Sequence, residues 1–177
     1  EALFFHRLPA LRSLTLKHTD TGVSSLKNCP NLQRLEALHL IGSNGISGEP
    51  DCQGLELFTE LRRLTLEIRD FCRPGSVDLL QQLNNLEELR LNSYLACGDN
   101  DLNKICELSR LRHLSLGVDD LSTRGLQTLS RLDELESLDL SFGYRSENIN
   151  RPGSLHFLND LPRLRSLKLD GHVHGRE

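Results

Sequence analysis

The nine residues from Leu83 to Leu91 read LNNLEELRL, so leucine stands at the first, fourth, seventh and ninth positions. This spacing recurs along the whole chain, with a phenylalanine in place of one leucine. The seven copies begin at Leu8, Leu32, Phe58, Leu83, Leu108, Leu132 and Leu161, at intervals of 24, 26, 25, 25, 24 and 29 residues. A period of this length is typical of a repeat protein in which each copy forms one structural unit.

The last two leucines of each copy predict a short β-strand. Alternate residues of a strand point to opposite faces, so both leucines of Leu-x-Leu face one side and the residue between them faces the other. Residues 76–83 and 122–129 instead carry apolar side chains at three- and four-residue spacing, which predicts short helical turns. We therefore expect strands of successive copies to pair in parallel and to bury their leucines against one another.

Over essentially its whole length the sequence resembles the leucine-rich repeat superfamily, on the seven copies of Leu-x-x-Leu-x-x-Leu-x-Leu. The resemblance implies an α/β fold, namely a right-handed solenoid that forms a segment of a horseshoe. A parallel sheet of about seven strands would form its concave side, and short helices its convex side. Residues 1–177 would be one domain. We interpret it as a fragment of a longer protein, because the sequence starts with Glu1 and contains no methionine.

The residues after each strand indicate a subtype of this superfamily. Many members place Asn or Cys three residues after the last leucine, whereas this chain has Thr19, Ser43, Arg69, Tyr94, Asp119, Gly143 and His172 there. The difference favours the irregular intracellular type over the bacterial and extracellular receptor types. Residues 28–32 (NCPNL) and 121–126 (LSTRGL) are similar to the cysteine-containing repeats of F-box leucine-rich repeat proteins.

Several polar residues are placed to cap the predicted helical turns. The tetrapeptide Arg-Pro-Gly-Ser occurs at 73–76 and again at 151–154. Its serine can accept a hydrogen bond from the first free N–H groups of the helix that follows. The predicted N-caps are Ser76, Asp101, Ser122 and Ser154.

The sign of the charge alternates strictly at the position that follows the second leucine of each copy. The residues at this position are Arg12, Glu36, Arg62, Glu87, Arg112, Glu136 and Arg165. Stacked coils bring them side by side, so they predict an exposed ladder of ion pairs that contributes roughly 0–1 kcal/mol per pair. Like charges at this spacing would repel, and the alternation therefore supports the register.

The residues between and beside the strand leucines form the predicted concave face. They are Ser13, Thr15, Lys17, Ala37, His39, Ile41, Arg63, Thr65, Glu67, Glu88, Arg90, Asn92, His113, Ser115, Gly117, Ser137, Asp139, Ser141, Ser166, Lys168 and Asp170. This set is polar, mixed in sign and poor in aromatic residues, which suits a folded protein or an extended peptide as the ligand. The middle strands hold the densest set of long polar side chains. The candidate contacts there are Arg63, Glu67, Glu88, Arg90, Asn92 and His113.

Two tyrosines in predicted loops complete the set of candidate binding residues. Tyr94 follows the fourth predicted strand, and Tyr144 lies in an enlarged connection, residues 141–150, which accounts for the interval of 29 residues. Aromatic residues are enriched in protein interfaces, and loops on a rigid scaffold often carry function.

Composition and motifs argue against other kinds of function. The formal net charge is -4 without segregated blocks of charge, so we expect neither nucleic acid nor a membrane as partner. The sequence contains no catalytic motif, and its histidines and five cysteines lack the spacing of a metal site, so we predict no enzyme activity, no metal and no cofactor. The odd number of cysteines and the absence of an N-glycosylation acceptor favour free thiols and a cytoplasmic or nuclear location.

The sequence therefore predicts a non-catalytic module that binds another protein or peptide through its concave face and adjoining loops. Two alternatives remain open: the substrate-recognition domain of an F-box (SCF-type) ubiquitin ligase, or a repeat domain of the GTPase-activating or immune-sensor type. Neither end carries a dedicated polar cap. We therefore also expect adjoining repeats, another domain or a partner chain to cover at least one open end.

Overall fold

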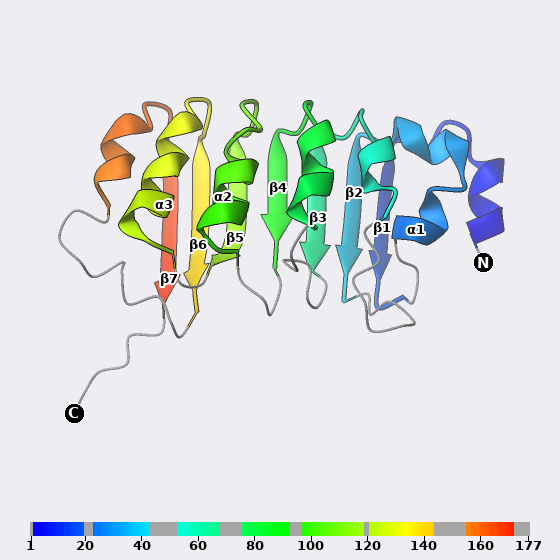
Figure 1. Cartoon of the computed structure of the whole chain (residues 1–177). Coiled ribbons are helices and arrows are strands. Elements are labelled where there is room, and N and C mark those ends of the chain that lie inside the picture. Colours follow the sequence, from blue (N-terminus) through cyan, green and yellow to red (C-terminus); the bar gives the residue numbers. More distant parts are fainter. Residues whose placement is uncertain are drawn as a thin grey trace.

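The computed structural model describes residues 2–19, 23–42, 53–67, 76–92, 97–118, 121–143 and 155–171, with side chains from Phe5 onward. Seven strands form one parallel sheet in the order of the sequence (Figure 1). The strands are β1 Ser13–Lys17, β2 Ala37–Ile41, β3 Arg63–Glu67, β4 Glu88–Leu91, β5 His113–Val118, β6 Ser137–Phe142 and β7 Ser166–Gly171. The predicted sheet, with one strand per copy, is confirmed.

A single register aligns the leucines of all the strands. Leu64 of β3 pairs with Leu89 of β4, and Leu66 pairs with Leu91, and the same correspondence joins every neighbouring pair of strands. From β2 to β6 each strand leucine is at most 2% exposed. Burying one leucine contributes about 1.5–3 kcal/mol, so this double row is a main source of stability.

Helical segments cover one face of the sheet, as predicted (Figure 1). They are η1 Ala2–Arg7, α1 Val23–Leu26, η2 Pro30–Arg34, η3 Leu55–Leu57, η4 Val77–Gln82, α2 Asp99–Ile105, α3 Thr123–Gln127, η5 Thr128–Arg131 and η7 His156–Asp160. Apolar helix residues such as Leu80, Leu102 and Leu126 join the strand leucines in one buried core. We call the helix-covered face the convex side and the opposite face of the sheet the concave face.

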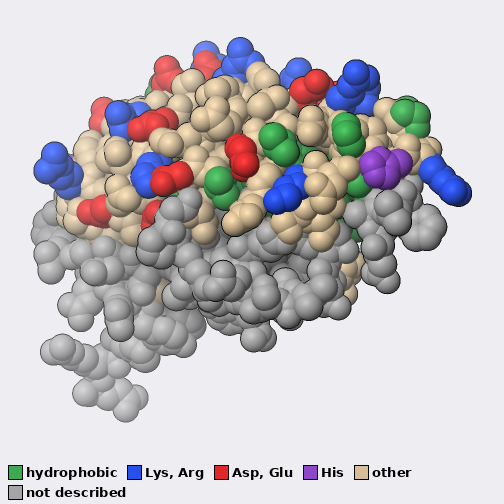
Figure 2. All heavy atoms as spheres, turned by 45° about the vertical axis from the view of Figure 1, so that its right-hand side comes forward, with side chains coloured by type: hydrophobic (Ala, Val, Ile, Leu, Met, Phe, Trp, Pro, Cys, Tyr) green, Lys and Arg blue, Asp and Glu red, His purple; other side chains and the backbone are tan. Residues whose placement is uncertain are grey.

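The charged residues that precede the strands form ion pairs between neighbouring coils. The pairs and their nitrogen–oxygen distances are Arg12–Glu36 (4.0 Å), Arg62–Glu87 (2.9 Å), Arg112–Glu136 (3.7 Å) and Arg165–Glu136 (3.6 Å). Acidic and basic side chains accordingly lie next to one another along the upper edge of the molecule, where the strands begin (Figure 2). We call this row the charge ladder. It confirms that opposite charges meet between coils.

Ser122 is a predicted helix cap that the structure confirms. Its Oγ accepts a hydrogen bond from the backbone N–H of Gly125 at 3.0 Å. The same hydroxyl donates to Asp99 Oδ2 at 2.5 Å, and the Ser122 N–H donates to Asp99 Oδ1 at 2.9 Å. These bonds hold the carboxylate of Asp99 against Gly125, where an added Cβ atom would collide with Asp99 Oδ1. The first turns of α2 and α3 are thereby joined.

Ser76 stands at the N-cap position of η4, as predicted, but the predicted capping hydrogen bond is absent, and the prediction of Asp101 as an N-cap is wrong. Ser76 has helical dihedral angles, φ -66° and ψ -35°, instead of the extended ones typical of an N-cap, and its side chain makes no capping hydrogen bond. Helix α2 has its N-cap at Gly98, three residues before Asp101, so Asp101 lies inside its first turn. There its carboxylate accepts a hydrogen bond from the Gly98 N–H at 3.3 Å. Ser154 lies outside the described residues.

We expect Gly125→Ala to lower the free energy of unfolding by about 1–3 kcal/mol through overpacking. This sign is the reverse of the usual helical preference for alanine over glycine, which is about 1 kcal/mol. Gly98→Ala is the matched control, because a Cβ there would meet no atom within 4 Å. Urea unfolding followed by circular dichroism measures both variants. A Gly125→Ala protein as stable as the Gly98→Ala protein would contradict the packing described here.

Candidate functional site

The structure brings together the candidate contacts of the middle strands on the concave face. They are Arg63, Glu67, Glu88, Arg90, Asn92 and His113. The register places Arg63, Glu88 and His113 side by side in one row across β3, β4 and β5. Candidates Tyr94 and Tyr144 lie outside the described residues. Six residues selected from sequence alone thus form one continuous cluster, which we call the central cluster.

Polar contacts organise the central cluster. Arg90 Nε lies 2.8 Å from Glu88 Oε1 on the same side of β4. Asn92 Nδ2 donates to Glu67 Oε1 on the neighbouring strand at 3.4 Å. Arg63 remains exposed beside Glu88. The cluster therefore presents both signs of charge within a few ångströms, with part of its geometry already fixed.

A histidine–threonine pair adjoins the central cluster on β2 and β3. His39 Nδ1 and Thr65 Oγ1 are 2.8 Å apart. Thr65 is only 5% exposed and Ala37 only 1%, so the expectation that the whole concave face is exposed is wrong at these two positions. A short side chain in a row of longer ones is shielded from solvent, which the repeat pattern does not encode.

The surroundings of His39 favour its neutral form. Burial lowers the pKa of His39 below its usual value of 6.5, Glu88 opposes this effect, and the cations Arg63 and Arg90 add to it. Desolvation and nearby positive charge both penalise a protonated imidazole. The imidazole therefore serves as a neutral hydrogen-bonding group at neutral pH.

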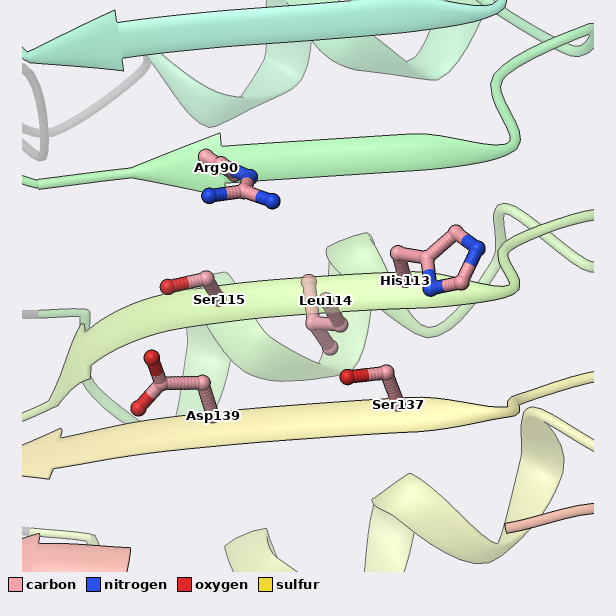
Figure 3. Close-up of a pocket in the computed structure, with 6 residues that line it drawn as sticks. All are labelled: Arg90, His113, Leu114, Ser115, Ser137 and Asp139. Carbon is pink, nitrogen blue, oxygen red and sulfur yellow. The ribbon is translucent and has the colours of Figure 1, made fainter. Parts of the chain in front are cut away.

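A hollow in the concave face lies beside the central cluster, over β4, β5 and β6 (Figure 3). Its lining residues are Arg90, His113, Leu114, Ser115, Ser137 and Asp139. Arg90, Ser115 and Asp139 occupy one row of the sheet. Because serine is short, space remains between the guanidinium on β4 and the carboxylate on β6.

Asp139 is the charged residue of this hollow that the sequence analysis placed on the concave face but did not include among the candidate contacts. Its Oδ2 lies 3.5 Å from Lys168 Nζ on β7, and its Oδ1 is buried without a hydrogen-bond partner. The available signal was the row itself, in which Ser115 separates Arg90 from Asp139. Comparing the residues that occupy the same concave position in successive copies would have placed Asp139 next to Arg90 and Ser115.

The described residues contain little that supports catalysis or metal binding. No three His, Cys, Asp or Glu side chains among them are grouped as metal ligands. Burial raises the pKa of the Cys106 thiol to about 11, so this free thiol is protonated at neutral pH and is a poor nucleophile. In the same ranges no helix is long and apolar enough to span a membrane.

Comparisons with known proteins rest on structure. No family model matches the sequence, and no curated protein matches it. Internalin C2 of Listeria monocytogenes is similar, with a TM-score of 0.61 and 21% identity over 96% of this chain and 68% of internalin C2. The internalin InlF of the same bacterium has a TM-score of 0.53 and 19% identity over 92% of this chain and 48% of its own. A leucine-rich repeat protein of Leptospira interrogans has a TM-score of 0.50 and 18% identity, covering 95% and 57%.

The chain has the leucine-rich repeat fold. Seven parallel strands in one open sheet and the leucine register agree with this assignment. The leucine-rich repeat proteins named above are bacterial, but an identity of 18–21% shows the fold alone. The intracellular subtype and the similarity to F-box repeats therefore stay predictions.

We expect the stability of this leucine-rich repeat chain to depend on the protonation of His39. Because its pKa is lowered in the folded state, its contribution is complete above pH 6.5 and is lost as the pH falls below that value. When the pH is lowered from 7.5 to 5, the limits of the assay, the thermal midpoint of the wild type should therefore fall more steeply than that of His39→Gln. Differential scanning calorimetry measures both slopes, with His113→Gln, at an exposed position, as the control. Equal slopes for wild type and His39→Gln would refute this expectation.

Proposed function

We propose that this chain is a non-catalytic module that binds another protein through its concave face. The observation that carries the proposal is the central cluster, in which exposed arginines lie beside carboxylates on the face that the described helices leave open. Arginine is enriched at protein interfaces and dominates many binding hot spots. A surface of mixed sign suits a folded protein partner, whereas nucleic acid would require mainly cations.

The fixed geometry of the central cluster favours specific recognition. The Arg90–Glu88 pair is already formed at 2.8 Å, so less side-chain freedom is lost when a partner binds. Arg63 stands beside Glu88 in the same row and can pair with a partner carboxylate. A partner with an acidic group opposite Arg63 and a basic group opposite Glu67 would match this pattern.

The hollow next to the central cluster gives the partner a place to insert one side chain. Ser115 and Ser137 supply hydroxyl groups that can both donate and accept hydrogen bonds. Arg90 supplies donors on one wall, and Asp139 supplies an acceptor on the other (Figure 3). A polar side chain that carries both kinds of group, such as a carboxamide, fits this lining.

The loops and the cellular location complete the proposal. We propose that Tyr94 and Tyr144 add contacts at the edge of the concave face, because they follow β4 and β6 in the sequence. The free thiol of Cys106 is compatible with the predicted cytoplasmic or nuclear location. That location stays a prediction.

The test is affinity purification of a partner with two variants of matched charge. The concave variant carries Arg63→Ala, Glu88→Ala and Arg90→Ala. The convex variant carries Lys104→Ala, Asp78→Ala and Arg131→Ala, which also removes one ion pair and one further arginine. We expect the concave variant to lose at least about tenfold in affinity for a partner that the convex variant retains, because interface arginines often contribute about 2 kcal/mol.

Circular dichroism and the thermal midpoint establish that both variants are folded. The partner is identified by mass spectrometry, and its affinity is then measured by calorimetry with purified proteins. Loss of binding by the convex variant, with full binding by the concave one, would contradict the proposal.

A further inference from the structure

One row of the concave face carries charges of alternating sign that are separated by a short residue. The register places the members of this row side by side on β4, β5, β6 and β7; they are Arg90, Ser115, Asp139 and Lys168. We call this set the Arg90 row. A partner that crosses the strands along it meets a cation, a hydroxyl group, a carboxylate and a second cation, in that order.

The charged groups of the Arg90 row can take contacts from a partner. Arg90 uses its Nε for Glu88, whereas its two terminal nitrogens have no hydrogen-bond partner among the described residues. The guanidinium group extends toward β5, over the hollow (Figure 3). Asp139 Oδ1 has no partner either, and Lys168, which lies 3.5 Å from Asp139 Oδ2, has a side chain that is 62% exposed. Exposed ion pairs contribute little to stability, so charges of a partner can replace the Asp139–Lys168 pair.

Short residues on both sides of the row leave room for a backbone element to lie along it. The flanking positions on β5 and β6 hold Gly117, Ser137 and Ser141, and the fourth flanking residue is His113, which lines the hollow. Rows on one face of a sheet lie about 6.6 Å apart along the strand, whereas an α-helix with its side chains is about 10–12 Å wide. A helix over the row would therefore cover the flanking rows as well, which longer residues there would prevent.

The spacing within the row matches an α-helix. Parallel strands lie about 4.8 Å apart, so Asp139 stands about 9.6 Å and Lys168 about 14.4 Å from Arg90 along the row. In a helix the residues i, i+4, i+7 and i+11 share one face, at about 0, 6, 10.5 and 16.5 Å along the axis. One helical turn therefore stands over each strand. The largest mismatch, about 2 Å, falls at Lys168, whose flexible stem can take it up.

An extended peptide fits the same row less well. Its side chains on one face repeat every 6.6 Å or so, which puts residue i+2 about 3 Å short of Asp139 when residue i stands over Arg90. Residue i+4, at about 13.2 Å, reaches Lys168. An extended segment can thus meet both cations of the row but leaves the carboxylate between them without a partner charge.

We propose that the Arg90 row binds an α-helix of the partner protein, which crosses β4 to β7 and carries an acidic residue at position i, a basic residue at i+7 and an acidic residue at i+11. An Asn or Gln side chain at i+4 enters the hollow beside Ser115. The inference rests on the function proposed above, because it specifies the kind of partner that the concave face takes.

The test is selection of binders to the full chain from two display libraries of equal diversity. In the first library, one face of an exposed helix in a small helical bundle is randomised. In the second, the same number of positions is randomised in a linear peptide. The selected binders are then purified, and their affinities are measured by calorimetry for the wild type, for the concave variant defined above and for two further variants.

The two further variants exchange charges without changing the composition of the chain. The exchanged row variant carries Asp139→Lys and Lys168→Asp. The exchanged helix variant is the matched control and carries Asp78→Lys and Lys104→Asp, which reverse an ion pair between η4 and α2 on the convex side. Circular dichroism establishes that both variants are folded.

We expect the helical library to yield binders with an acidic, a basic and an acidic residue at i, i+7 and i+11. Their affinity should fall at least about tenfold on the exchanged row variant, because two attractive contacts become repulsive, and should stay within about twofold on the exchanged helix variant. Selection on the exchanged row variant should instead yield an acidic residue at i+7 and a basic residue at i+11.

Several results would overturn the inference. If only the linear library yields binders that the concave variant loses, the face takes an extended segment, and the proposed function still stands. If neither library yields a binder, or if helical binders hold the exchanged row variant as tightly as the wild type, the row does not select a charged helix. If all binders keep full affinity for the concave variant, the result counts against the proposed function as well.

Discussion

The structure depends on one constraint: every Leu-x-Leu strand pairs in parallel with the next in a single register. This register puts the leucines of all the strands into one core and sends the residues between them to the concave face. A slip of one residue would exchange the two faces, exposing leucines such as Leu89 and burying charges such as Arg90. Core stability and surface chemistry therefore cannot be varied independently in this chain.

The register also turns the surface into rows that cross the strands. The charge ladder is one such row, and Arg90, Ser115, Asp139 and Lys168 form another. Each row brings together residues about 25 positions apart in the sequence, a spacing typical of this repeat. A hollow forms where a row places a short residue between long ones. Recognition sites on such a sheet thus arise from the order of side-chain sizes and charges along a row.

Much of this arrangement could be predicted from the sequence, because the repeat period fixes which residues are neighbours. The strands, the ion pairs such as Arg62–Glu87 and the cap at Ser122 follow from that period. The missed features depend on local geometry in three dimensions. Ser76 makes no capping hydrogen bond because its dihedral angles are helical, and Thr65 is buried because longer neighbours shield it. Asp139 was not among the candidate contacts because only the charge ladder, and not the rows of the concave face, was compared across copies.

Site-specific photocrosslinking tests most directly whether the concave face is the binding surface. A benzophenone-bearing amino acid is placed at His113 on the concave face in one protein, and at Asn103 in α2 on the convex side in another; both positions are exposed. The complex with the purified partner is then irradiated. We expect a covalent adduct from position 113 and none from position 103. An adduct from position 103 without one from position 113 would contradict this expectation.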